Sequence, residues 1–504
     1  MHPWRKWAGG VALLALAGCG NDGGAAAADT GGGSSSDSAS GDGAKAADAV
    51  QPGYTSELAS PFATPAWAAQ GWAPARVLSF DPTVRRRGLR EVRGLIHAHT
   101  AYSHDACDGK PFDEAGQINA PCVEDFRRDL CAVGHDYVFM TDHPTHFKDH
   151  PFPDVLHYQE ASGDALIQRE GVMLANRMKC PDGHTVVLIP GTEGGMMPVG
   201  LDGHIADPTE RAKVYGGHDA QTREALIAAG AHVLAQHTED WTPEQLGEKG
   251  WAGFEMYNLH ANMMAHMNDA AKLFPILLAE GETMHPDLIL VALVDEDPRY
   301  QETWARVAEA GHRRVTTMGT DCHRNTFNLA LSDGERVDSY RRMMIWFSNH
   351  LLIEPEADGS FDDRHLEAAL ASRRLFGVFE VLGYAEGFDA RIERSGGKAP
   401  AEIGGEASLK DGLTIVADTP HVARLPADAE MPEIWSRILL AKDGKWVEQA
   451  KGEGRVSFAP TAAGAYRVEV RIRPKHLRKH LGSLSAKADA DYAWVYANTF
   501  YVTE

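Results

Sequence analysis

The sequence is short of basic residues: its 504 residues include 49 Lys and Arg against 71 Asp and Glu, a formal net charge of −22. An acidic surface repels phosphate backbones, so we expect no nucleic-acid partner. The six cysteines include no Cys-x-x-Cys pair, which argues against a cysteine-based zinc site. Internal repeats are also absent. At 43% hydrophobic residues, the chain has the composition of a globular protein of two or three domains.

The first apolar run, VALLALAG, is too short to span a bilayer but suits the core of a signal peptide. Arg5 and Lys6 precede it, and Leu16-Ala17-Gly18-Cys19 resembles the bacterial lipoprotein signal. The resemblance implies that residues 1–18 are removed and that Cys19 carries a lipid anchor in the membrane. Gly20 then favours the outer membrane, facing the periplasm or the cell surface. A plain secretory signal is the alternative, and both predict export.

The next two segments are not expected to form a domain. Residues 19–50 are rich in Gly, Ala, Ser and Asp and contain no aromatic residue, so they are predicted to be a disordered tether. Residues 51–90 are rich in Pro and Ala and are expected to be an irregular lead-in packed on the following domain.

The other cysteines predict disulfides, because the exported chain meets an oxidising compartment. An odd number remains after Cys19, so one thiol stays unpaired unless it pairs between chains. Cys322, between two candidate metal ligands, is expected to be that thiol. The remaining four can pair in three ways, which the sequence leaves open: Cys107, Cys122, Cys131 and Cys180.

From residue 91 to about 390, apolar strand-like runs alternate with helical ones, which predicts an α/β domain with a parallel sheet or barrel. Strands are expected at 92–100, 136–143, 185–190, 231–237, 253–258 and 313–323, and helices at 122–134, 222–230, 297–311 and 363–373. The apolar run 288–294 fits neither period. From 391 to 504, short β-like runs separated by Gly, Pro and Asp predict a small antiparallel β-sandwich.

Candidate metal ligands follow the predicted strands of the α/β domain. The first strand ends in HAHTAYSHDA and the second in TDH; the third leads into PGTEGG, the fourth ends in QH and the last in GTDCH. Carboxyl ends of parallel strands meet at one edge, where α/β barrels place their active sites. Nine residues form the candidate set, enough for two or three divalent ions of Zn, Mn or Fe: His97, His99, Asp105, His143, Glu193, His204, His237, Asp321 and His323.

Taken in order, HxHTxxSxDA, TDH, PGxE, a lone His and GTDxH resemble the polymerase and histidinol phosphatase (PHP) superfamily. The resemblance covers roughly residues 90–390 and implies a distorted (β/α)7 barrel with metal-dependent phosphoesterase activity. It assigns His97, His99, Glu193 and Asp321 to one metal. Glu193 would bridge to a second metal held by His204 and His237, and the third would take Asp105, His143 and His323.

Several assignments stay open. His104 competes with Asp105, because the family often has SDG where this chain has Ser103-His104-Asp105-Ala106. His204 and His237 have rivals, since Thr238 replaces the family's usual Pro. Their rivals, which match no motif, are His218, His232 and His260. Asp142 is expected to orient a neighbouring ring rather than bind metal, and Arg324 to hold a phosphate or to lie on the surface.

The preferred hypothesis is a metal-dependent phosphatase acting on a small phosphorylated substrate, in which a metal-bound hydroxide attacks phosphorus. No leaving-group acid can be assigned; His104 and His260 are the candidates. One alternative is a non-catalytic surface lipoprotein that binds a ligand or partner, although none of the motif residues is missing. Another is an amidohydrolase-like metal hydrolase, disfavoured because no Lys lies at a strand end.

Overall fold

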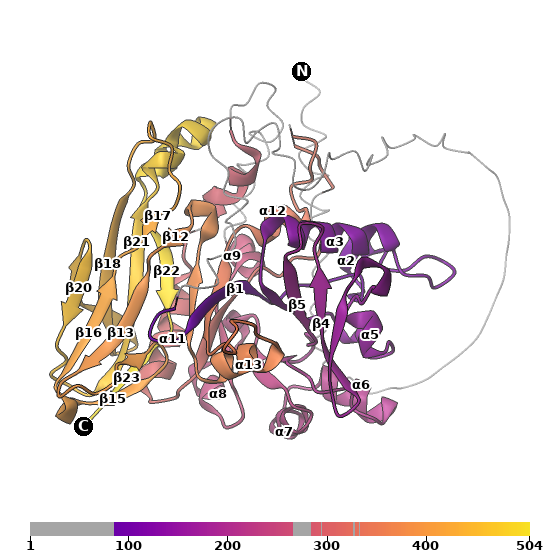
Figure 1. Cartoon of the computed structure of the whole chain (residues 1–504), viewed down its shortest axis with the longest axis horizontal. Coiled ribbons are helices and arrows are strands. Elements are labelled where there is room, and N and C mark those ends of the chain that lie inside the picture. The colour runs from indigo at the N-terminus through magenta and orange to yellow at the C-terminus, as the bar shows by residue number, and fades with distance from the viewer. Residues whose placement is uncertain (1–84, 266–283, 294, 326–327, 332) are drawn as a thin grey trace, which may run out of the picture. The chain divides into compact units, whose positions relative to one another are not determined.

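The computed structural model describes residues 85–265, 284–293, 295–325, 328–331 and 333–504 (Figure 1). The predicted signal peptide, Cys19, the tether and the lead-in as far as residue 84 lie outside the described residues. Within the described part of the chain, no helix is long and apolar enough to cross a membrane.

The chain is a mixed α/β protein built on a sheet of 13 strands. Its main path runs β15 (Glu406–Ser408), β23 (Phe500–Thr503), β21 (Gly464–Arg473), β22 (Tyr492–Ala497), β11 (Leu375–Val378), β10 (Ser348–Ile353), β1 (Arg90–Ile96), β2 (Tyr137–Phe139), β5 (Thr185–Ile189), β4 (Val172–Lys179) and β3 (Ala165–Arg169). Strand β18 (Glu433–Lys442) pairs with β21 and with β19 (Lys445–Gly452).

A second sheet runs in the order β6 (Met197–Val199), β7 (His232–Ala235), β8 (Gly253–Asn258) and β9 (Val315–Gly319). Strands β7, β8 and β9 are parallel, as are β1, β2 and β5 in the large sheet. Isolated bridges link the two sheets, from Ala98 to Cys322 and from Gly191 to Val199. The first bridge is parallel, so it sets the carboxyl ends of β1 and β9 beside each other.

Helices connect and cover these strands. The longer ones confirm the four predicted helices and add α6: α3 (Ala120–Val133), α6 (Pro208–Gly216), α7 (Ala220–Ala228), α11 (Pro298–Glu309) and α13 (Asp363–Ala371). Asn119 caps α3 by accepting a hydrogen bond from the Cys122 amide, and Gly134 ends it at φ 72°. Short helices are α2 (Ala106–Gly109), α4 (Pro144–Phe147), α5 (Phe152–Val155), α8 (Pro243–Gly247), α9 (Leu259–Ala265) and α12 (Tyr340–Met344). The described residues of the ambiguous apolar run, 288–293, fall in a 3-10 helix, η5 (Pro286–Leu293).

The predicted C-terminal strands form, but most of them, namely β18, β19, β21, β22 and β23, continue the large sheet (Figure 1). Strand β11 pairs antiparallel with β22, with Phe376 opposite Ala497, and β10 pairs antiparallel with both β1 and β11. A smaller sheet holds β14 (Ala401–Glu402), β13 (Asp389–Arg394), β16 (Leu413–Asp418) and β20 (Arg455–Phe458), and β12 (Ala385–Glu386) pairs with β17 (His421–Val422). The closed barrel and the separate sandwich are therefore not confirmed, and the domain boundary at 390 stays a prediction.

The structure contains two disulfides, which correspond to one of the three possible pairings. Cys107 bonds Cys122, and Cys131 bonds Cys180. The first ties the loop after β1 to the start of α3, and the second ties the end of α3 to the residue after β4. Among the described cysteines, Cys322 is unpaired and buried, as predicted.

Candidate metal centre

The predicted strand ends do bring most of the candidate ligands together. Eight of the nine lie in one cluster: His97, His99, Asp105, His143, Glu193, His237, Asp321 and His323. Three cluster residues have left-handed backbones, with φ 82° at His97, 47° at His237 and 54° at Asp321. Such strain is uncommon outside glycine and is concentrated at functional sites.

At the centre, four buried atoms face one another: His97 Nε2, His99 Nε2, Glu193 Oε2 and Asp321 Oδ1. The two nitrogens are 3.1 Å apart, and each lies 3.1–3.2 Å from both carboxylate oxygens. Asp321 Oδ1 accepts no hydrogen bond although it is buried. Two ring nitrogens and two anionic oxygens directed at one point form a ligand set for a divalent cation.

Five of the six distances among these atoms are 3.1–3.2 Å, as in a tetrahedral set of ligands. In a regular tetrahedron the edge is about 1.6 times the distance from centre to corner. A regular tetrahedron with edges of 3.1–3.2 Å has its centre about 1.9–2.0 Å from each corner, close to zinc–nitrogen and zinc–oxygen bond lengths.

Four histidines are held by their Nδ1 atoms, so that Nε2 is presented to the cluster. His97 Nδ1 lies 2.6 Å from Glu255 Oε1, and His99 Nδ1 lies 2.7 Å from Ser103 Oγ. His143 and His323 use backbone carbonyls, those of Glu193 and Asp321, each at 2.9 Å. An acceptor at Nδ1 fixes the tautomer that leaves Nε2 able to bind a metal.

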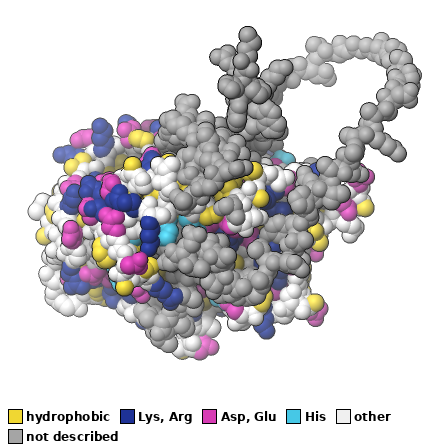
Figure 2. Space-filling view, turned by 90° about the horizontal axis from the view of Figure 1, so that it is seen from above, with side chains coloured by type: hydrophobic (Ala, Val, Ile, Leu, Met, Phe, Trp, Pro, Cys, Tyr) yellow, Lys and Arg dark blue, Asp and Glu magenta, His cyan; other side chains and the backbone are white. Residues whose placement is uncertain are grey.

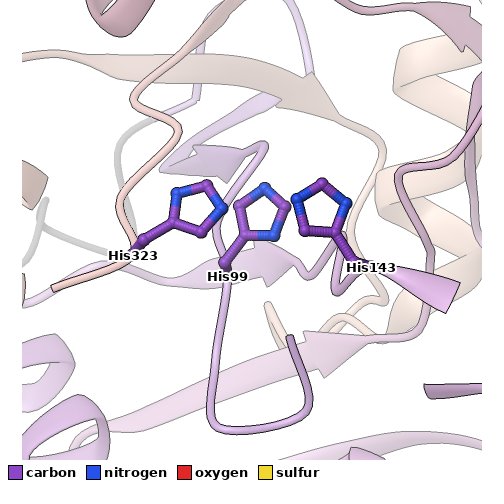
Figure 3. A group of neighbouring side chains, drawn as sticks. All are labelled: His99, His143 and His323. Atoms are coloured by element: carbon purple, nitrogen blue, oxygen red, sulfur yellow. The ribbon is translucent and has the colours of Figure 1, made fainter. Parts of the chain in front are cut away.

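Beside the central four atoms lies a second group, made of His143, His323 and Asp105. Asp105 Oδ2 is 3.3 Å from His323 Nε2 and 3.7 Å from His143 Nε2. Figure 3 shows His323 and His143 on either side of His99, and the His99 and His323 rings stack at 3.7 Å. His104 is exposed, with its ring 5.0 Å from that of His143. Since Asp105 contacts both rings, it fits the open ligand position better than His104.

Glu193 also reaches toward a third group. Its Oε1 lies 3.1 Å from His237 Nε2, while its Oε2 faces His97 and His99, which is the arrangement of a bridging carboxylate. His260, at the start of α9, places Nδ1 3.3 Å from Asp321 Oδ2. The residues positioned for a second ion are thus His237 and His260.

His204 must be corrected, because the structure places it away from the cluster. Its Nδ1 lies 3.0 Å from the Tyr215 hydroxyl and its Nε2 2.7 Å from the His150 carbonyl, so both nitrogens are engaged. Its ring packs edge-on against Phe147 and Phe152. Of its rivals, His260 joins the cluster, whereas His218 and His232 make no contact with it within the described contacts.

The supporting residues differ in part from the predictions. Asp142 orients no ring directly; it accepts hydrogen bonds from the amide and hydroxyl of Thr100 and so fixes the loop after β1. Arg324 pairs with Asp125 at 3.1 Å. Sequence reasoning missed Glu255, although a carboxylate inside the apolar run GFEMYN was a signal. Gly319 makes room for it, because a Cβ there would lie 1.9 Å from Glu255 Oε1.

The electrostatics also favour a cation. Burial lowers the pKa of His97, but Glu193, Glu255 and Asp321 outweigh it and raise that pKa well above its usual value. Burial also lowers the pKa of His99, but Asp321 and Glu193 outweigh it and raise that pKa to about 9. Burial raises the pKa values of Glu193 and Asp321, but the facing histidines hold both well below the ordinary range. The cluster therefore retains positive charge at its centre, as protons or as a metal ion.

No family model matches the sequence, and no curated protein matches it. One solved structure is similar: a two-domain protein containing a predicted PHP-like metal-dependent phosphoesterase from Bacteroides vulgatus. The alignment covers 84% of this chain and 98% of that chain, with 12% sequence identity and a TM-score of 0.31. Similarity at this level carries no argument about the reaction, so the function has to be inferred from the site itself.

Proposed function

We propose that the protein is a metal-dependent phosphoesterase acting on a small phosphorylated substrate. The observation that carries this proposal is the central group of four, in which Nε2 of His97 and Nε2 of His99 lie 3.1–3.2 Å from each other and from carboxylate oxygens of Glu193 and Asp321. The bridging position of Glu193 supports a second ion at His237 and His260, and Asp105, His143 and His323 support a third. The same proposal includes a barrel-like arrangement, in which the two sheets close around the carboxyl ends of the strands that carry these residues.

Divalent ions in these positions, Zn, Mn or Fe, would act as Lewis acids on a phosphoryl group and supply the activated water for hydrolysis. The role of the surrounding side chains is to position the metal ligands. Glu255 and Ser103 fix the imidazoles of His97 and His99, and Asp142 holds the loop that carries Ser103 through Thr100. His104, exposed beside His143, is the remaining candidate for the leaving-group acid. His260 is better placed as a ligand.

The experiment is metal analysis followed by phosphate-release assays on phosphomonoesters, phosphodiesters and nucleotides. We expect at least two equivalents of divalent metal, hydrolysis of one of these classes, and loss of both in His97→Ala plus His99→Ala. Metal content below one equivalent would refute the metal proposal. Full metal content without turnover of any class would refute the phosphoesterase proposal alone and favour a binding role.

We also propose that the chain is exported and lipid-anchored at Cys19, facing the periplasm or the cell surface. The disulfides Cys107–Cys122 and Cys131–Cys180 support export, because such bonds persist in oxidising compartments. Metabolic labelling with a fatty acid is expected to mark the protein and not its Cys19→Ser variant. Equal labelling of the two would contradict the anchor.

A further inference from the structure

A cavity separate from the histidine cluster lies between α11 and the C-terminal strands. Its volume is about 420 Å³, within the range of small-molecule sites. Its floor is β21, one wall is α11 with Gln301 and Glu302, and the other is the β18–β19 hairpin with Trp446. Glu309, at the end of α11, accepts hydrogen bonds from the hairpin amides of Asp443 and Gly444, so the two walls are fixed to each other.

The floor of this cavity is an unusual row of buried charges. Arg467, Glu469 and Arg471 alternate along β21 on one face, with exposed fractions of 2%, 2% and 8%. Glu469 is shared: it accepts from Arg467 at 2.7 Å, from Arg471 at 3.2 Å and from Arg437 at 3.3 Å. Buried charges seldom add net stability compared with apolar packing, so this row calls for a reason other than stability.

The lining leaves polar atoms of both kinds without hydrogen-bond partners. The guanidinium of Arg467 lies over the rings of Trp304 and Trp446, at 4.2 and 4.5 Å. Its Nε and Nη1 donate no hydrogen bond, and neither does Trp446 Nε1. Gln301 Oε1, an acceptor, has no hydrogen-bond partner. Tyr492 Oη, which can donate or accept, has none either. A buried polar atom without a partner costs free energy, which a ligand that reaches it recovers.

The charge of the lining narrows the class of ligand. Five carboxylates line the cavity, namely Asp295, Glu296, Glu302, Glu469 and Asp491, against four basic residues, Arg437, Lys445, Arg467 and Arg471. Figure 2 shows the same mixture on the surface, where Lys and Arg lie among Asp and Glu on the side of the C-terminal strands. An anion would meet more negative than positive lining groups. A hydroxyl both donates and accepts, so it suits unpaired atoms of both kinds without adding charge.

We propose that this cavity binds a neutral, hydroxyl-rich molecule: a saccharide of one or two rings. Its hydroxyls would accept from Arg467 and Trp446 and donate to Gln301 and to carboxylates such as Glu302. The rings of Trp446 and Tyr492 would pack against its C–H faces. This site is independent of the proposed phosphoesterase centre.

The test is saturation-transfer NMR on the purified protein with glucose, galactose, mannose, N-acetylglucosamine, maltose and cellobiose, and with inorganic phosphate and acetate as anionic probes. We expect saturable binding of at least one sugar, unchanged after the metal is removed with a chelator. Trp446→Phe keeps an aromatic ring, smaller than the indole, and removes one donor, so it is expected to weaken the binding of that sugar about threefold to tenfold. Trp435→Phe, a tryptophan on β18 outside the cavity lining, is the matched control and should bind as the unchanged protein does.

No saturable binding by any of the six sugars would overturn the proposal, as would binding of phosphate or acetate in place of sugars. Equal affinities in Trp446→Phe and Trp435→Phe would place the sugar elsewhere and also overturn it. Gln301→Met, with a similar volume and no acceptor oxygen, gives a second variant if Trp446→Phe fails to fold, and the same weakening is expected. Because binding is read without the metal, these outcomes are separate from failure of the phosphatase proposal.

Discussion

Glu255 offers the sharpest test of the metal centre, because it contacts the ligand His97 without belonging to the central group of four. Its Oε1 lies 2.6 Å from His97 Nδ1, and both side chains are fully buried. Glu255→Gln removes the charge while keeping the shape. The imidazole of His97 then loses a charged acceptor, and its Nε2 becomes a weaker ligand. Loss of such a supporting partner typically lowers metal affinity about 10–100-fold, or roughly 1.4–2.8 kcal/mol.

The full burial of this pair places the expected loss toward the upper end of that range, since no water replaces the missing charge. Affinity is measured by competition with a chromogenic chelator at constant pH. The matched control is Glu91→Gln, because Glu91 Oε1 makes the same buried contact, at 2.7 Å, to Nδ1 of His350 outside the cluster. Both variants should lose some stability, and only Glu255→Gln should lose metal affinity. Equal metal affinities in the two variants would refute this reasoning.

Three further predictions follow from individual contacts. His260→Ala is expected to lower the bound metal by one equivalent, whereas His204→Ala should keep the full content; the reverse would restore the original assignment. Burial, assisted by Arg127, lowers the pKa of His157 to about 3, so the folded chain resists a proton that the unfolded chain takes up below its usual pKa of 6.5. The free energy of unfolding is therefore expected to fall as the pH falls from 6.5 toward 3, by about 2 kcal/mol at pH 5. Urea titrations over this pH range should show a smaller loss for His157→Asn than for the unchanged protein. Cys131→Ser is expected to lower stability by about 2–4 kcal/mol, and an unchanged urea midpoint would contradict a bond to Cys180.

Much of the cluster could be predicted because its residues directly follow apolar runs that become parallel strands. His97, His237 and Asp321 come within two residues of the ends of β1, β7 and β9, and parallel strands bring their carboxyl ends to one edge. The sequence therefore contained both the ligand types and the edge at which they meet.

The assignment of His204 as a metal ligand was wrong because of the direction of the strand that precedes it. The residues before it form β6, a three-residue strand too short to recognise, which pairs antiparallel with β7 and matches Val199 with His232 at the start of β7. The chain leaving β6 therefore emerges at the edge opposite to the carboxyl end of β7. His260 instead follows β8, which is parallel to β7, so it arrives on the same side as His237. A one-dimensional pattern contains no information about the direction of so short a strand.

The C-terminal strands could be predicted individually, but their partners could not, because pairing depends on which edge is left open in the folded chain. Strand β11 offers that edge to β22, and Asn498 extends the contact to the second sheet. Its side chain accepts from the Thr316 amide and donates to the carbonyls of Thr316 and Leu375, at 2.8–3.1 Å, and it is fully buried. Trp494 likewise donates to the Gly383 carbonyl.

These contacts bear on whether the region after residue 390 is a separate domain. A chain ending at residue 390 would expose β11 and leave the Thr316 backbone groups in β9 without partners, and β9 leads directly into Asp321 of the cluster. An exposed edge strand also templates aggregation. We therefore expect such a chain to aggregate and to lose metal binding, as judged by size-exclusion chromatography and metal analysis. A soluble 390-residue chain with the full metal content would show that the α/β part folds alone. The sheet continuity would then be a contact between two independent domains.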